Sequence, residues 1–191
     1  MDSKFKVGFT LVEALVGFGL IGIISVLVAA LYLTNYKLFA NQTTSIDINS
    51  QNKLAVDDIT NQIRQSQAVA ASCCSGDTTS ATVLVLQLWP LDASGDPKDP
   101  SGSAYDYFVY KIDPTDPTRI QKKIVPDASS TRPASTKVLT TKLATDGLQF
   151  TYNNATPSLA SEITVTITTT GTASGKTQTV TQAGNGTLRN K

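Results

Sequence analysis

The chain has 191 residues, of which 40% are hydrophobic and 16% are charged, and its formal net charge is +1. It contains no histidine and only two cysteines, which excludes His-based acid–base catalysis, a Ser-His-Asp triad and an ordinary zinc site. The balanced charge, without a Lys/Arg-dense stretch, argues against a nucleic-acid surface. We therefore expect a protein that is not an enzyme and has no direct nucleic-acid partner.

A long apolar segment follows a short, basic N-terminus. From residue 7 to 36 the only charged residue is Glu13, and residues 14–33 are almost wholly apolar. A helix of about twenty residues is about 30 Å long, which is the thickness of the hydrocarbon core of a bilayer. Because Lys4 and Lys6 precede the segment, the positive-inside tendency keeps the N-terminus in the cytoplasm and exports the rest. These features predict a single-pass membrane protein.

Three interpretations of this segment compete. It can be a helix that only anchors the domain, or a secretory signal peptide cleaved near Val28-Ala29-Ala30, although it is longer than the usual apolar run of about 7–15 residues. The third interpretation must explain Glu13, because a carboxylate inside the apolar part costs about 2–3 kcal/mol or more unless it is paired or near an interface. A simple anchor has no use for such a residue.

The residues around Glu13 form a recognisable motif. Residues 4–13 read Lys-Phe-Lys-Val-Gly-Phe-Thr-Leu-Val-Glu, with the apolar run directly behind them. This sequence closely resembles the class III signal of type IV pilins and type II secretion pseudopilins. The resemblance implies that prepilin peptidase cuts between Gly8 and Phe9, removes residues 1–8 as a leader, and methylates the new amino group of Phe9.

Cleavage would give Glu13 a counter-charge. The new ammonium group of Phe9 lies four residues before Glu13, on the same face of the helix. The family resemblance further implies that the amine belongs to a neighbouring subunit and that Glu13 sets the axial register of a filament. The alternative is a Glu13 side chain that is paired within the chain or solvated by lipid headgroups.

The helix is expected to continue far beyond the membrane. All eight prolines lie at or after Pro90, and no glycine occurs between Gly22 and Gly76, so nothing forces a helix to end before about residue 72. We predict a transmembrane and assembly helix over residues 9–36 and an amphipathic continuation over 37–72, with a bend or frayed turn in its polar stretch 41–50. Its apolar stripe comprises Val56, Ile59, Ile63 and Ala70.

From residue 81 onward the apolar pattern alternates with a period of two, which is typical of strands that bury one face. We therefore predict an α+β protein with a type IV pilin-like fold, in which the helical stripe covers antiparallel sheets of an exported domain, residues 73–191. The candidate strands are 83–89, 105–112, 119–125, 137–143, 148–152, 163–167 and 176–182.

The order of these elements resembles the minor-pilin group that includes pseudopilin J and PilW-like proteins. The resemblance rests on three segments, which are Leu-Gln-Phe-Thr-Tyr at 148–152, Ile-Thr-Val-Thr-Ile at 163–167 and Thr-Leu-Arg-Asn at 187–190. It implies a minor subunit, located in the bacterial inner membrane, that initiates or caps a type IV pilus or a type II secretion pseudopilus. The implied partners are other pilin subunits, prepilin peptidase, a platform protein and an assembly ATPase. The alternative is a monomeric, membrane-anchored binding or adhesion domain.

Two further features are candidate sites. For Cys73 and Cys74, which are adjacent in an exported domain, a strained vicinal disulfide, two free thiols and links between subunits remain open. Asp92, Asp96 and Asp99 provide oxygen ligands that could begin a calcium site, but the twelfth position of an EF-hand loop would be serine here rather than glutamate. A surface turn is the favoured interpretation, and no cofactor or metal is expected apart from this weak calcium candidate.

Overall fold

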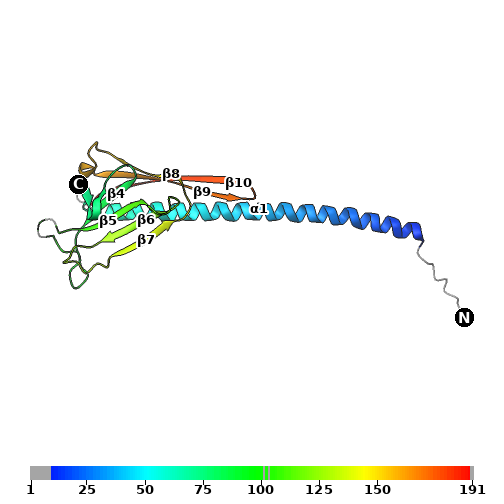
Figure 1. Cartoon of the computed structure of the whole chain (residues 1–191), viewed down its shortest axis with the longest axis horizontal. Helices are drawn as coiled ribbons and strands as arrows, with labels where there is room; N and C mark the ends of the chain where they lie inside the picture. Colours follow the sequence, from blue (N-terminus) through cyan, green and yellow to red (C-terminus); the bar gives the residue numbers. More distant parts are fainter. Residues whose placement is uncertain (1–9, 101, 103, 190–191) are drawn as a thin grey trace.

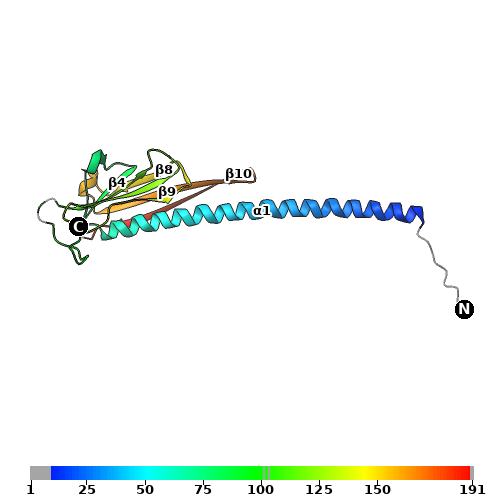
Figure 2. The same ribbon diagram turned by 60° about the horizontal axis from the view of Figure 1, so that its bottom comes forward.

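The computed structural model describes residues 10–100, 102 and 104–189 (Figure 1). A single 55-residue helix, α1 (Leu11–Gln65), forms the axis of the molecule. At about 1.5 Å per residue this helix is about 80 Å long. Its first half projects alone, and its second half packs against antiparallel sheets (Figures 1 and 2). The predicted α+β class and pilin-like arrangement are therefore confirmed.

The strands of the described residues form a five-stranded sheet, a three-stranded sheet and a small hairpin. The sheet orders are β1-β4-β5-β6-β7, β10-β9-β8 and β2-β3, and all pairs are antiparallel. Each predicted strand is present, although the candidate 137–143 covers the end of one strand and the start of the next. The bounds are β1 (Ala68–Val69), β2 (Ser72–Cys73), β3 (Asp77–Thr78), β4 (Val83–Leu88), β5 (Asp106–Ile112), β6 (Ile120–Val125), β7 (Ser135–Thr140), β8 (Leu143–Tyr152), β9 (Glu162–Ala173) and β10 (Lys176–Thr187).

Of the bend or frayed turn expected in the polar stretch 41–50, the frayed turn does not form, since every residue of this stretch is part of α1. Its polar side chains bond back to the preceding turn: the Thr43 hydroxyl donates to the Phe39 carbonyl at 3.0 Å, and the Asn49 amide donates to the Ser45 carbonyl at 2.9 Å. Such bonds satisfy side chains that would otherwise compete with the helical backbone. The stretch is therefore polar and helical at once.

The helix ends at Gln65, before the predicted end near residue 72. Ser66 leaves the helical region with a ψ of 150°, and its hydroxyl donates to the Gln62 carbonyl at 2.6 Å. The chain then pairs through β1 with the edge of β4. Ala70 is therefore buried against the sheet and is not part of the helical stripe. An edge strand can bury the same apolar residues that a helical stripe would bury.

The core lies between α1 and the sheets. The predicted stripe residues Val56, Ile59 and Ile63 are buried in it, at 6%, 0% and 0% exposure. The remaining core consists mainly of sheet residues, including Leu84, Leu86, Phe108, Tyr110, Leu148, Phe150, Ile163, Val165 and Ile167.

Two glycines let β10 approach the helix closely. A Cβ atom at Gly184 would lie 2.5 Å from Val56 Cγ1, and one at Gly186 would lie 2.7 Å from Ile63 Cγ2. Between the helix and the strands, Asn52 is fully buried, and its amide nitrogen lies 2.9 Å from the Val180 carbonyl oxygen. These contacts fix the position of the sheet along α1.

A polar cluster joins the helix to the five-stranded sheet. The hydroxyl of the fully buried Tyr110 donates to Asp58 Oδ2 at 3.1 Å, and Lys122 Nζ lies 2.9 Å from the same oxygen. Burial, followed by the charge of Asp58 and its hydrogen bond, raises the pKa of Tyr110 well above its usual value of 10.0. Tyr110 is therefore neutral in the folded protein far into the alkaline range.

This pKa shift predicts a loss of stability at high pH. Because the folded pKa is raised, the contribution of Tyr110 is fully present below the unfolded pKa of about 10 and is lost as pH rises above it. We expect the free energy of unfolding to fall by about 1.4 kcal/mol per pH unit for this group. Urea unfolding of the full chain in detergent, between pH 9 and 11 (about one unit on either side of that pKa), should show a steeper decline than in Tyr110→Phe. Equal slopes would contradict the prediction.

Candidate functional site

The N-terminal half of α1 presents an apolar surface on all sides. Every large apolar side chain from Leu11 to Phe39 is at least 54% exposed. An exposed apolar surface of this extent requires lipid or a protein partner. The helix is also long and apolar enough to cross a membrane.

Glu13 lies in the first turn of this helix, whereas the predicted processing residues Gly8 and Phe9 lie outside the described residues. Thr10 is the N-cap: its hydroxyl oxygen accepts from the Glu13 backbone N–H at 3.3 Å. In return, Glu13 Oε2 accepts from the Thr10 backbone N–H at 3.4 Å and from the Thr10 hydroxyl at 3.2 Å. This reciprocal pair is a capping box, which satisfies otherwise unpaired N–H groups at the helix start.

The capping box does not require the leader. Its two backbone donors belong to Thr10 and Glu13, which both follow the expected cleavage site between Gly8 and Phe9. The Thr10 nitrogen remains an amide after such a cut. The carboxylate of Glu13 is therefore held at the start of the apolar helix by residues that such a cut would leave in place.

A shallow groove of about 420 Å³ runs along the exposed part of α1. Gly19 and Gly22 form its floor, and a Cβ atom at either position would meet nothing within 4 Å. Small residues of this kind let a second helix approach closely in a membrane. The groove is thus suited to helix–helix packing.

The structure joins Cys73 and Cys74 in a vicinal disulfide. Of the alternatives left open by the sequence, this is the one present in the described chain. The half-buried Cys73 packs against Ala70, Val85 and Val109, at the end of β2. The disulfide therefore lies at the turn between β2 and β3, against one face of the five-stranded sheet.

Replacing both cysteines by serine should have a small effect on stability. A disulfide stabilises mainly by constraining the unfolded chain, and for a loop without intervening residues this amounts to about 1 kcal/mol. We expect Cys73→Ser/Cys74→Ser to lower the free energy of unfolding by about that amount in urea titrations. A loss of about 3 kcal/mol or more, the value for loops of about fifteen residues, would show that the pair has a larger structural role.

The acidic loop that could begin a calcium site forms a surface turn. Asp92 Oδ1 accepts from the backbone N–H groups of Ser94 at 2.8 Å and Asp96 at 3.0 Å, and Gly95 has a φ of 84°. The fold does not gather Asp92, Asp96 and Asp99 into one set of ligands, and no group of three or more His, Cys, Asp or Glu side chains suited to a metal occurs among residues that the structure describes.

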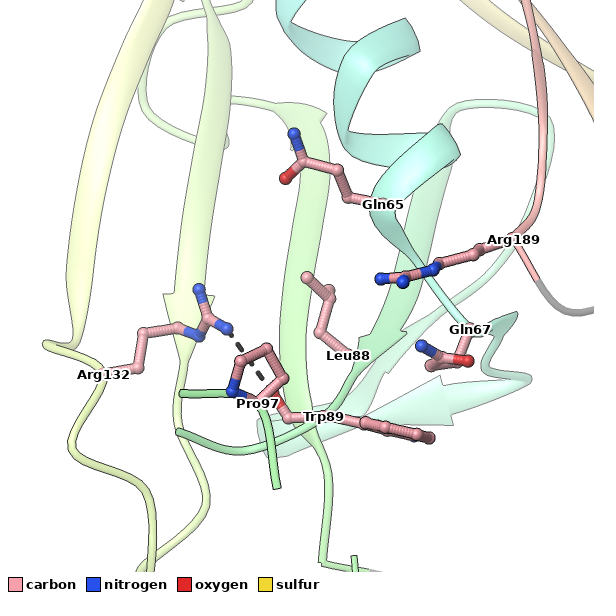
Figure 3. A pocket seen from close by; sticks show the side chains of 7 residues that line it. All are labelled: Gln65, Gln67, Leu88, Trp89, Pro97, Arg132 and Arg189. Carbon is pink, nitrogen blue, oxygen red and sulfur yellow. Dashed lines mark hydrogen bonds between the residues drawn. The ribbon is translucent and has the colours of Figure 1, made fainter. Parts of the chain in front are cut away.

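A groove that no sequence motif indicates lies at the end of the domain where α1 stops (Figure 3). Its volume is about 510 Å³. The lining residues come from five separate parts of the chain, so no local motif marks the groove. The one available signal is the chain's single tryptophan, which directly follows a strand and precedes a proline. The groove is lined by Gln65, Gln67, Leu88, Trp89, Pro97, Arg132 and Arg189.

Arg132 is held in place within this groove. Its Nε donates to Asp106 Oδ2 at 2.7 Å, and its Nη2 donates to the Trp89 carbonyl at 3.4 Å. The fully buried Asp106 also accepts from the Ser130 hydroxyl at 2.8 Å and from the Asp127 backbone N–H at 2.9 Å. The guanidinium group of Arg132 is therefore pre-oriented by a buried carboxylate.

Fold and surface together define an α+β protein with one N-terminal helix that can span a membrane and a globular domain on the far half of that helix. In comparisons with known proteins, no family model, curated protein or solved structure matches this chain. Its more specific role must therefore be inferred from its own residues.

Proposed function

We propose that this chain is a minor subunit of a type IV pilus or a type II secretion pseudopilus, which initiates or caps the assembly of the filament. The observation that carries the proposal is the place of Glu13. It is the only charged residue between positions 7 and 36, and it lies in the first turn of an exposed apolar helix. The class III signal-like residues 4–13 surround it.

The shape of the helix supports this role. A filament subunit must be soluble in lipid before assembly and must then bury the same surface against other subunits. The all-round apolar surface of residues 11–39 and the glycine-floored groove meet both needs. The globular domain packs only on the second half of α1, so it leaves this surface accessible.

The proposal also names a location and partners. The chain is inserted in the bacterial inner membrane with its globular domain exported, and prepilin peptidase processes it between Gly8 and Phe9. Other pilin subunits then contact its N-terminal helix, while a platform protein and an assembly ATPase act on the growing filament. Glu13 pairs with the N-terminal amine of a neighbouring subunit, which compensates its charge in the apolar surroundings.

Mass spectrometry of the mature chain, purified from the membranes of a cell that has a prepilin peptidase, tests the proposal. The expected N-terminus is N-methylated Phe9. An intact Met1 would leave a monomeric membrane-anchored binding domain as the function, and a start near Leu31 would indicate a cleaved secretory signal. Either result would contradict the filament proposal.

A further inference from the structure

Strand β10 has a partner on one side only, because it is the last strand of the sheet β10-β9-β8. With β9 it forms a long hairpin that runs along the second half of α1 (Figures 1 and 2). Proteins usually protect such an edge with a proline, a bulge, a charge or a very short strand. In contrast, β10 is twelve residues long, contains no proline, pairs with β9 without a bulge, and carries its only charge at its first residue, Lys176. This edge is therefore open to another strand.

The contacts of β9 show which backbone groups of β10 point outward. The Thr170 N–H donates to the Lys142 carbonyl at 2.7 Å, directly before β8. The Thr168 carbonyl oxygen also points toward β8, because a Cβ atom at Gly147 would lie 2.4 Å from it. The backbone groups of Thr168 and Thr170 therefore face β8 and point away from β10.

The partners of these two residues on β10 are Thr181 and Thr179. Opposite residues in an antiparallel pair either exchange both hydrogen bonds or exchange none. Thr179 and Thr181 therefore direct their N–H and C=O groups to the free edge, where no residue that the structure describes bonds to them. Along a strand such groups repeat every second residue, at about 7 Å, which matches the repeat of a second extended polypeptide backbone.

A groove of about 390 Å³ lies beside this edge, and we call it the edge groove. A Cβ atom at Gly171 of β9 would lie 2.9 Å from Ile48, and one at Gly184 of β10 would lie 2.5 Å from Val56. At about 100° per residue, Val56 lies about 80° around α1 from Ile48, and Ile46 lies about 160° around in the same direction. Ile46 is therefore beyond β10, on the side away from β9. The edge groove is lined by Ser45, Ile46, Asn49, Ser50, Lys53 and Gln182.

The edge groove offers an apolar contact and a cation. Ile46 is 69% exposed, although it lies beyond the apolar run that ends at Phe39. The exposed Lys53 forms no ion pair with any described residue, including Asp57 four residues further on, and no acidic residue is among those that line the groove. Alternate side chains of an added strand would point into the groove. An apolar and an acidic side chain on that face would cover Ile46 and pair with Lys53.

We propose that the free edge of β10 and the edge groove bind an extended polypeptide segment of another protein, which adds to the sheet as a strand antiparallel to β10. Antiparallel pairing is slightly more stable per residue than parallel pairing. β10 runs in the same direction as α1, from near Asn41 to near Ile63. The added strand therefore passes Lys53 before Ile46, so its acidic residue precedes its apolar residue.

The spacing of these two residues follows from the helix. Lys53 and Ile46 are seven residues apart, which is about 10 Å along α1. Side chains on one face of a strand are about 7 Å apart at two residues and about 13 Å apart at four. The bound segment therefore carries its apolar residue two or four positions after its acidic residue. A second β10 in antiparallel pairing would reverse its own α1, which two chains inserted in one membrane in the same orientation cannot do.

A fluorescein-labelled peptide that reads Ser-Thr-Glu-Thr-Ile-Thr-Val-Thr-Gln is the probe, because it carries Glu, Ile and Val on one face and threonine on the other. The full chain in detergent micelles is titrated into this peptide, and fluorescence anisotropy is measured. We expect a saturable rise in the micromolar to millimolar range. Empty micelles should give no saturable rise. A peptide with Lys in place of Glu should bind at least about threefold more weakly, as expected for an exposed charge pair.

Variants of the edge and of the groove locate the binding. Thr181→Pro removes an outward N–H and leaves the bonds to β9 in place, as proline on an edge strand allows, and should weaken binding at least about tenfold. Thr181→Val, which keeps that N–H, should bind like the unchanged chain. Lys53→Glu should reverse the preference between the Glu and Lys peptides. Because Lys53 is exposed, this exchange does not depend on how well Thr181→Pro folds.

The absence of saturable binding, equal binding by Thr181→Pro, an equal loss in Thr181→Val, or an unchanged peptide preference in Lys53→Glu would each overturn the proposal. Self-association of the chain that Thr181→Pro abolishes would assign the edge to a second copy and would also overturn it. The site is complete within one chain, so its binding does not depend on the filament proposal. None of these results would bear on N-terminal processing.

Discussion

Replacement of Glu13 by alanine is expected to reduce incorporation of the chain into filaments at least tenfold, while membrane insertion stays unchanged. In the proposed filament this carboxylate pairs with a neighbour's N-terminal amine in apolar surroundings. Removal of one partner of such a pair leaves a buried charge unpaired and costs about 3–5 kcal/mol, so a tenfold loss is a lower bound. Insertion should not suffer, because an apolar side chain is more soluble in lipid than a carboxylate. The measurement is the ratio of the chain in sheared filaments to the chain in membranes.

Two control variants separate the charge of Glu13 from its capping role. Glutamine at the third helical position can still accept from the N-cap backbone, so Glu13→Gln keeps the capping box and removes only the charge. It should lose incorporation as severely as Glu13→Ala. Asp57→Ala, which removes an exposed carboxylate from the second half of the same helix, should have little effect. Normal incorporation of Glu13→Gln would refute the proposed charge pairing.

Removal of the buried carboxylate at position 106 is expected to be the most destabilising change in the globular domain. The Asp106 side chain has no solvent exposure, and it accepts from Arg132, Ser130 and the Asp127 backbone. Asp106→Ala would leave these three donors without their partner, and loss of one member of a buried ion pair costs about 3–5 kcal/mol. We expect urea unfolding of the full chain in detergent to show a loss of about this size.

An exposed ion pair provides the comparison for Asp106. Arg119 and Asp116 form a pair at 2.9 Å whose side chains are 45% and 32% exposed, so Arg119→Ala should cost at most about 1 kcal/mol. The double variant Asp106→Ala/Arg132→Met should recover part of the stability lost in Asp106→Ala, since it also removes the unpaired cation. A loss below about 1 kcal/mol for Asp106→Ala would show that this buried pair contributes no more than a surface pair.

The overall fold could be predicted because its elements carry strong periodic signals. Threonine alternates with apolar residues along much of the strand 162–173, and the N-terminal helix carries a long apolar run. Each pattern identifies its element from the sequence alone. The end of the helix could not be predicted, because Val69 and Ala70 fit a helical stripe and an edge strand equally well. Pairing with β4, which lies fourteen or more residues further along the chain, decides between them.

The candidate sites likewise differ in whether the sequence alone reveals them. Glu13 stands out in the sequence because a single carboxylate interrupts thirty residues without other charges. The groove at the end of α1 could not be predicted, because the fold brings its lining residues together from separate parts of the chain. The state of Cys73 and Cys74 was open for a related reason: it depends on the backbone conformation of a turn, in which Cys74 has a φ of 25°.

In the proposed membrane-inserted state, the hairpin of β9 and β10 sets how close the domain lies to the bilayer. It reaches along α1 as far as Asn41, whose carbonyl accepts from the Gln178 side chain at 3.1 Å (Figure 2). The helix before this contact, residues 11–40, is about 45 Å long, which equals a bilayer with its headgroups, about 40–45 Å. In the proposed membrane-inserted state no flexible neck separates lipid from protein, and the hairpin tip rests at headgroup level. In this state, any force that draws the helix out of the membrane must therefore move the whole domain together with the helix.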